Sequence, residues 1–157
     1  MNFLDHPELV RKALSGIPDE ARPLCDGLDH LGLAVESLEA SVPLYRDLLE
    51  LPLLDTETIK SDGVRVAIFD LKGAHLELLE PSSEESPVAK FLRKRGPGLH
   101  HVALRVKDCA AAVAALREAG ISMIDEAPRP GAGGKLIAFC HPRSTGGVLL
   151  ELCQRTT

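Results

Sequence analysis

Two histidines and two glutamates stand at matching places in two similar halves of this chain. His30 opens the run His-Leu-Gly-Leu-Ala-Val, and His101, 71 residues later, opens His-Val-Ala-Leu-Arg-Val. Glu77 and Glu151 each stand between two leucines near the end of their half, 74 residues apart. Imidazole nitrogens and carboxylate oxygens together suit a borderline divalent ion such as zinc, cobalt, nickel, iron or manganese. The pattern therefore predicts one metal site with His30, Glu77, His101 and Glu151 as ligands.

The glutamates support this prediction more strongly than the histidines do. A single histidine in a strand is more often a hydrogen-bonded core residue than a ligand. A carboxylate inside an apolar run such as 148–152 is costly to bury unless a metal ion or another cation pairs with it. Because side chains alternate along a strand, we exclude His100, next to His101, and His75, near Glu77, from the ligand set.

Each half has the element order expected of a βαβββ module, because hydrophobic periodicity changes along it from two to about 3.6 residues and back. In the first half we expect strands over 28–35, 53–59, 64–71 and 74–79, with a helix over about 38–49. In the second half we expect strands over 99–106, 135–140 and 148–153, a further strand that starts with 121–124, and a helix over about 109–119. The predicted fold class is α+β, with paired βαβββ modules forming a curved mixed sheet around the metal site.

The domain organisation follows from this repeat. Residues 1–27 lie outside it and form an N-terminal extension, predicted to be helical and to pack on the body or on a neighbouring subunit. Residues 28–157 are predicted to form a single domain made of the modules 28–81 and 98–153. A short helix over 87–95 and a Gly-Pro-Gly linker separate the two modules.

Composition excludes several classes of function. The net charge of −5 and an aromatic share of 3% argue against a nucleic-acid partner, which needs basic surfaces and stacking platforms. No apolar run is long enough to span a bilayer, and no signal or transit peptide is recognisable, so we expect no membrane partner. The four cysteines lack metal-type spacing, which favours a reduced, cytoplasmic protein.

Several longer stretches resemble a known family. From about residue 28 to 153 the chain resembles the vicinal oxygen chelate (glyoxalase/bleomycin-resistance) superfamily, most closely its methylmalonyl-CoA epimerase branch. The runs Ser-Pro-x-Ala-Lys-Phe-Leu and His-Pro-x-Ser-Thr-Gly-Gly-Val-Leu-x-Glu-Leu are specific to that branch. The stretches that carry the resemblance are 30–35, 77–81, 86–92, 98–103, 125–132 and 141–152.

The resemblance implies a paired βαβββ fold, commonly a homodimer, and a divalent metal held by the same four residues. Co²⁺ is the ion expected first, with Zn²⁺, Ni²⁺ or Mn²⁺ as alternatives. The implied reaction is inversion at C2 of the acyl-CoA substrate methylmalonyl-CoA through a metal-stabilised enolate. Glu151 is then the candidate base as well as a ligand.

One departure from the family pattern concerns the second base. Some epimerases carry a further glutamate in the third strand, where this chain has Val66, and some have glutamine where it has Glu77. Inversion needs a proton delivered from the opposite face, and Glu77 is our candidate for that role.

Two other functions remain open at this stage. One is a glyoxalase I-type lyase acting on a glutathione hemithioacetal, which shares the fold and a His/Glu/His/Glu ligand set. The branch-specific run near the C-terminus counts against it. The other is a metal-free small-molecule binding protein of the same fold, which usually lacks the ligands that are present here.

Overall fold

The computed structural model describes residues 6–156, which fall into two units. One unit is Asp29–Val102. The other joins the N-terminal segment through Leu28 to the part of the chain that begins at Ala103. The strands that open the two modules, β1 (Cys25–Ala34) and β5 (Gly98–Val106), each contribute residues to both units.

The unit Asp29–Val102 contains the first module in the predicted order. Its strands are β1, β2 (Leu53–Ile59), β3 (Val64–Asp70) and β4 (His75–Pro81), and its helices are α2 (Leu38–Pro43) and α3 (Pro87–Arg95). They form the order β2-β3-β4-β1, in which β1 runs parallel to β4 and the other pairs are antiparallel. The predicted first module is confirmed.

Helix α2 ends earlier than the expected 38–49. The Ser37 hydroxyl caps its start by accepting a hydrogen bond from the Ala40 N–H at 3.2 Å. After Pro43, which has no N–H to donate, the chain continues as a wider π-helical turn, Leu44–Leu48. The periodicity predicted the helical segment correctly, and the change of pitch lies at Pro43, where the sequence indicates a kink or a later start of the helix.

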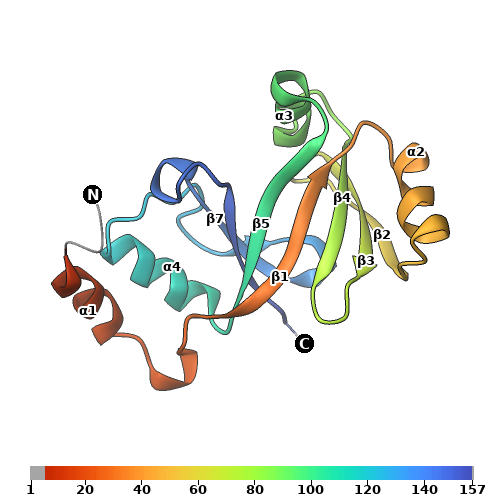
Figure 1. Ribbon diagram of the computed structural model, residues 1–157. Helices are drawn as coiled ribbons and strands as arrows, with labels where there is room; N and C mark the ends of the chain where they lie inside the picture. The colour runs from red at the N-terminus through yellow and green to blue at the C-terminus, as the bar shows by residue number, and fades with distance from the viewer. Residues whose placement is uncertain (1–5, 157) are drawn as a thin grey trace. The chain divides into compact units, whose positions relative to one another are not determined.

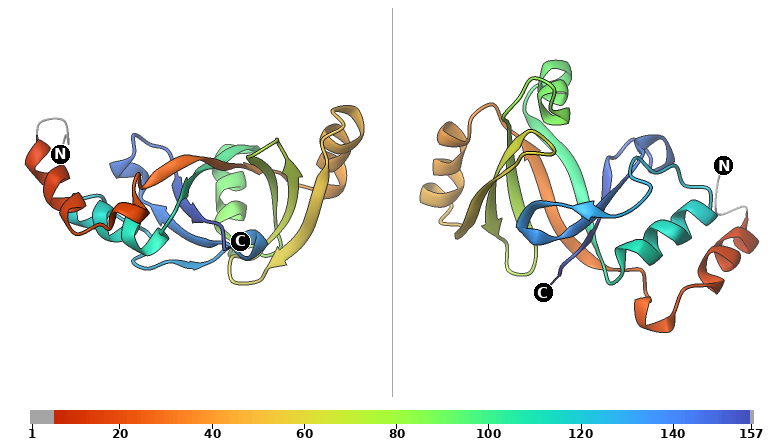
Figure 2. Two further views of the ribbon diagram at one scale, coloured as in Figure 1. Left: turned by 90° about the horizontal axis from the view of Figure 1, so that it is seen from below. Right: turned by 180° about the vertical axis from the view of Figure 1, so that it is seen from behind.

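The two faces of this sheet have different surroundings. Leu38 of α2 packs on one face with Phe69 and Leu78, both fully buried, and Figures 1 and 2 show α2 beside β2–β4. Ile68 pairs with Glu77 in the β3–β4 register, so these two side chains share the opposite face. Glu77 therefore lies on the face that α2 does not cover.

The other unit contains the N-terminal extension and the rest of the second module. Its helices are α1 (Pro7–Ser15) and α4 (Cys109–Glu118), with 3₁₀ turns η2 (Asp19–Ala21), η4 (Ala132–Gly134) and η5 (Pro142–Ser144). Its remaining strands are β6 (Arg129–Pro130), β7 (Leu136–Cys140) and β8 (Leu150–Gln154), paired antiparallel in the order β8-β7-β6.

The N-terminal extension packs on its own chain. Helix α1 lies against α4 (Figure 1), and the Lys12 ammonium is 2.7 Å from the Glu118 carboxylate. Lys107 Nζ donates a hydrogen bond to the Arg22 carbonyl at 2.7 Å. The predicted helix is confirmed from Pro7 onward, and residues 1–5 of the extension lie outside the described part of the chain. The division into an extension and one two-module domain remains a prediction.

The prediction that a strand starts with 121–124 is wrong. These residues form only an isolated bridge, and the second strand of the module is the two-residue β6 within the stretch rich in glycine and proline. The Asp125 carboxylate accepts a hydrogen bond from the Phe139 N–H at 2.9 Å. The Phe139 N–H is therefore not available to a backbone carbonyl of residues 121–124. These residues contact β7 but do not continue as a strand.

Helix α4 covers one face of β7 and β8. The Asp108 carboxylate caps the helix by accepting from the Ala111 N–H at 2.9 Å. Val113 of α4 belongs to the same buried cluster as Ala138 and Leu152 of these strands. Because Phe139 pairs with Glu151 in the β7–β8 register, Glu151 points to the opposite face, away from α4. Each predicted glutamate ligand therefore lies on the face that its own module's helix leaves uncovered.

The structure confirms the predicted fold class, α+β with paired βαβββ modules. None of the helices formed by residues 6–156 has the length and apolar character needed to cross a bilayer.

Three of the four cysteines are buried, and none of the four forms a disulfide. Burial raises the pKa of the Cys109 thiol to about 12, with contributions from Cys153 and Asp108. Burial alone raises the pKa of Cys140 to about 11. The thiolate is the reactive form, so these two thiols are inert at neutral pH.

We therefore expect one thiol per chain, that of the exposed Cys25, to react rapidly with a chromogenic disulfide reagent at neutral pH. The other three should react only after denaturation, since they are buried. The absorbance of the released chromophore, with and without denaturant, measures both populations. Cys25→Ser should abolish the fast phase, and a fast phase that survives this substitution would contradict the burial of the other thiols.

Candidate metal centre

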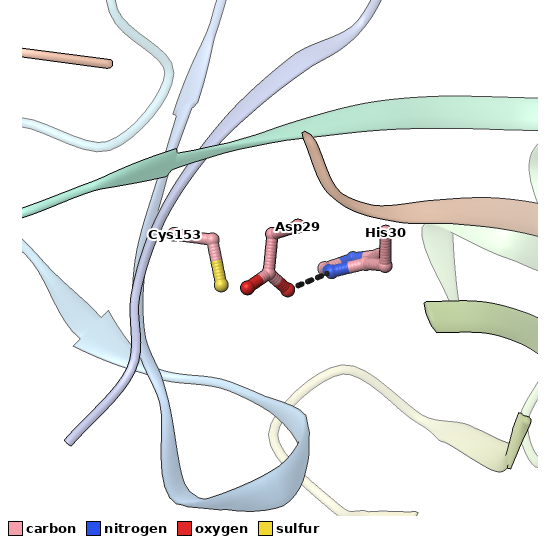
Figure 3. Close-up of side chains that lie close together, drawn as sticks. All are labelled: Asp29, His30 and Cys153. Carbon is pink, nitrogen blue, oxygen red and sulfur yellow. Dashed lines mark hydrogen bonds and ion pairs between the residues drawn. The ribbon is translucent and has the colours of Figure 1, made fainter. Parts of the chain in front are cut away.

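His30 is held by the residue that precedes it. Both side chains are buried near the middle of β1. Its Nδ1 lies 2.8 Å from Asp29 Oδ1, and Figure 3 shows the carboxylate pointing at the ring. A carboxylate oxygen can only accept, so Nδ1 carries the hydrogen, and in a neutral ring Nε2 then presents its lone pair.

Glu77 reaches His30 from the neighbouring strand. Parallel pairing of β1 with β4 sets Gly32 beside Glu77, and Gly32, two residues after His30, shares its face. Glu77 Oε2 lies 3.4 Å from His30 Nε2, and both side chains are about 3% exposed. A carboxylate this deeply buried needs a cation or a hydrogen-bond donor beside it.

His101 completes the group from β5. Its Nε2 is 3.0 Å from His30 Nε2, and the two rings meet edge to face with centroids 5.1 Å apart. The donor atoms of His30, Glu77 and His101 all lie within 4.8 Å of one another, and all three residues are buried. The structure therefore brings three of the four predicted ligands together.

These donors suit a divalent cation. Two imidazole nitrogens 3.0 Å apart need either a hydrogen on one of them or a cation between them. The neighbouring carboxylate supplies negative charge, and histidine with carboxylate is a common ligand set for zinc and related ions. The residues present thus fit the predicted metal.

The fourth predicted ligand belongs to the other unit. Glu151 is 3% exposed in β8, on the face away from α4. A buried carboxylate is normally paired with a cation, and a role as metal ligand would provide one for Glu151. Its place as fourth ligand and as base remains a prediction.

Comparisons with known proteins now decide the family. Residues 29–139 match the model of the Glyoxalase/Bleomycin resistance protein/Dioxygenase superfamily. This chain belongs to that superfamily.

Three relatives place the chain within the superfamily. It is 44% identical over 127 residues to the uncharacterized protein YqjC of Bacillus subtilis, covering 81% of this chain and 91% of that one. It is 39% identical to the crystal structure of methylmalonyl-CoA epimerase from Mycobacterium tuberculosis, with a TM-score of 0.83 and coverage of 87% and 93%. It is 36% identical to a methylmalonyl-CoA epimerase solved in complex with methylmalonyl-CoA and NH₄⁺, with a TM-score of 0.81 and coverage of 85% and 96%.

Two features of this superfamily member were not found from the sequence. Gly32 is the first. A Cβ added there would lie 2.2 Å from Cε1 of His101, so only glycine leaves room for the ring. Sequence comparison of the two halves showed merely a small residue in this place.

The histidine that precedes His101 is the second. Alternation placed His100 on the other side of the strand, yet its Nδ1 lies 2.9 Å from Nδ1 of His101. His75 was also excluded from the ligand set, and this exclusion remains a prediction. The reason given for it was wrong, because His75 is two residues from Glu77 and shares its face.

Proposed function

We propose that this protein is a metal-dependent methylmalonyl-CoA epimerase. The observation that supports this most strongly is the buried convergence of His30, Glu77 and His101 in a chain similar to an epimerase solved with methylmalonyl-CoA. We infer that these three residues and Glu151 hold the metal, with Co²⁺ as the first candidate and Zn²⁺, Ni²⁺ or Mn²⁺ as alternatives. A divalent cation bound there supplies positive charge that lowers the energy of an enolate.

The chain's own carboxylates carry the proton in this proposal. Glu151 takes the proton from C2, which leaves the electron pair delocalised into the thioester carbonyl. A second group then returns a proton to C2 from the opposite face, which inverts the centre. Charge and atoms balance, because one proton leaves C2 and one comes back.

Glu77 is our candidate for the second proton carrier. Val66, the position of the further glutamate in some epimerases, is 1% exposed in β3. It lies two residues from Ile68, which pairs with Glu77, so Val66 and Glu77 share one face of β3 and β4. In this proposal the Glu77 carboxylate on the adjacent strand takes the acid–base role that a glutamate has at the position of Val66 in some epimerases.

Deuterium wash-in tests the proposal. Incubation of the cobalt-loaded protein with methylmalonyl-CoA in D₂O should introduce deuterium at C2, together with racemisation, as measured by mass spectrometry. A chelator-stripped sample and His101→Ala should show neither, whereas His141→Ala, a change at an exposed histidine outside the converging group, should behave like the parent protein.

Absence of exchange with cobalt bound would reject the epimerase. The hemithioacetal assay would then test the glyoxalase I-type alternative.

The proposal includes a homodimer located in the cytoplasm. Light scattering of the purified protein tests the assembly, since a dimer has twice the 16.9 kDa mass of the chain. A mass of 16.9 kDa at working concentration would contradict it.

A further inference from the structure

The mechanism proposed above leaves His100 without a role. This half-buried residue precedes His101 in β5, and the Nδ1 atoms of the two rings are 2.9 Å apart. At that distance one Nδ1 donates a hydrogen and the other accepts it. The direction of this hydrogen bond is therefore linked to which nitrogen of His101 carries the hydrogen.

The two histidines of the converging group are held in equivalent ways. Asp29 contacts Nδ1 of His30 at 2.8 Å, and His100 contacts Nδ1 of His101 at 2.9 Å. In both rings the other nitrogen, Nε2, points to the shared position, where the two Nε2 atoms are 3.0 Å apart. Each ring is thus held by a contact at Nδ1, and its Nε2 faces the shared position.

The ring of His100 is itself fixed. Phe91 of α3 meets it edge to face, with centroids 5.0 Å apart and an interplanar angle of 70°. His101 also meets it edge to face, with centroids 5.2 Å apart and an interplanar angle of 86°. The Arg95 guanidinium lies 5.9 Å from the Phe91 centroid and covers this stack. A ring held between a helix and a neighbouring side chain offers its Nδ1 in one direction.

We propose that His100 is a positioning residue of the metal centre. It accepts a hydrogen bond from Nδ1–H of His101 and so keeps the lone pair of Nε2 directed at the cation, as Asp29 does for His30. The inference rests on the proposed metal-dependent function. Outer contacts of this kind typically change metal affinity by about 10–100-fold when removed.

Substitution at His100 separates the hydrogen bond from ring packing. His100→Phe keeps an aromatic ring against Phe91 but has no acceptor. His100→Asn loses the ring but places an amide oxygen where Nδ1 was. His6→Phe changes an exposed histidine outside the converging group and is the matched control.

The measurement is the Kd for Co²⁺, obtained by competition with a chromophoric chelator. We expect His100→Phe to raise the Kd about 10–100-fold, and His100→Asn and His6→Phe to change it by less than about threefold. An unchanged Kd in His100→Phe, or equal losses in the Phe and Asn variants, would overturn the inference. Failure of the parent protein to bind Co²⁺ would instead reject the metal-dependent function, and the inference with it.

A second readout does not depend on the variants folding. In the zinc-loaded parent protein, ¹⁵N–¹H correlation spectra of the imidazoles assign the nitrogen that carries hydrogen. We expect it to be Nδ1 in His101 and Nε2 in His100. Hydrogen on Nδ1 of His100 would overturn the inference.

Discussion

The Glu77→Gln variant should lose about 10²–10⁴-fold in the rate of inversion at C2 while it retains most of its bound metal. Glutamine has the shape of glutamate, and its amide oxygen can still contact a cation, but it cannot take up or release a proton at neutral pH. The loss should appear in kcat rather than in KM, because substrate binding is unchanged.

The geometry around Glu77 makes this substitution informative. The residue is 2% exposed and lies on the sheet face that α2 does not cover. Its Oε2 lies 3.4 Å from His30 Nε2, so a role as ligand and a role as proton carrier are both within reach. Only the second role needs a group that ionises.

The rate of inversion, measured with a single C2 epimer of methylmalonyl-CoA, and the metal content, measured by elemental analysis on the same sample, distinguish the two roles. Glu85→Gln, a change of an exposed carboxylate in the same unit, is the matched control and should leave both quantities unchanged. If metal content falls in proportion to activity in Glu77→Gln, Glu77 is a ligand only, and another residue returns the second proton.

Gly32→Ala should remove most of the affinity for Co²⁺. The added methyl carbon would lie 2.2 Å from Cε1 and 2.5 Å from Nδ1 of His101, closer than carbon atoms approach in proteins. The His101 ring has to move, and Nε2 moves with it away from His30. Because overpacking of this kind typically costs about 1–3 kcal/mol, the fold should survive while the site is distorted.

The same chelator competition measures this effect, and the unfolding midpoint reports on stability. Gly16→Ala is the matched control, since nothing lies within 4 Å of a Cβ at that position. Its Co²⁺ affinity should equal that of the parent protein. A Gly32→Ala variant that binds Co²⁺ as tightly as the parent would show that the His101 ring does not need the space which glycine provides.

The repeat in the sequence predicted the elements well because each depends on local patterns. Alternating apolar residues predicted β2 and β3 to within one residue. Helices α3 and α4 begin where the sequence predicted them, and the side chains of Ser86 and Asp108 cap their starts. The stretch 121–124 has the same apolar character yet forms no strand, because its partner Phe139 is engaged by the Asp125 side chain. That contact joins residues 14 positions apart and leaves no periodic signal.

For the candidate site too, some features could be predicted from the sequence and others only from the structure. By itself the sequence determined which residue types are present, in which strands, and on which face of each strand they lie, since alternation has a period of two. The in-register positions of His30, Glu77 and His101 were sufficient to predict that these side chains lie together.

Only the tertiary structure decided how these side chains are held. Parallel pairing of β1 with β4 sets Gly32 beside Glu77, and the close approach of the His101 ring to Gly32 makes glycine necessary there. The contact between His100 and His101 contradicts what simple alternation suggests, because Nδ1 lies near the backbone and can reach a neighbour on the same strand. Such contacts depend on distances between strands and on ring rotation, which a one-dimensional pattern does not encode.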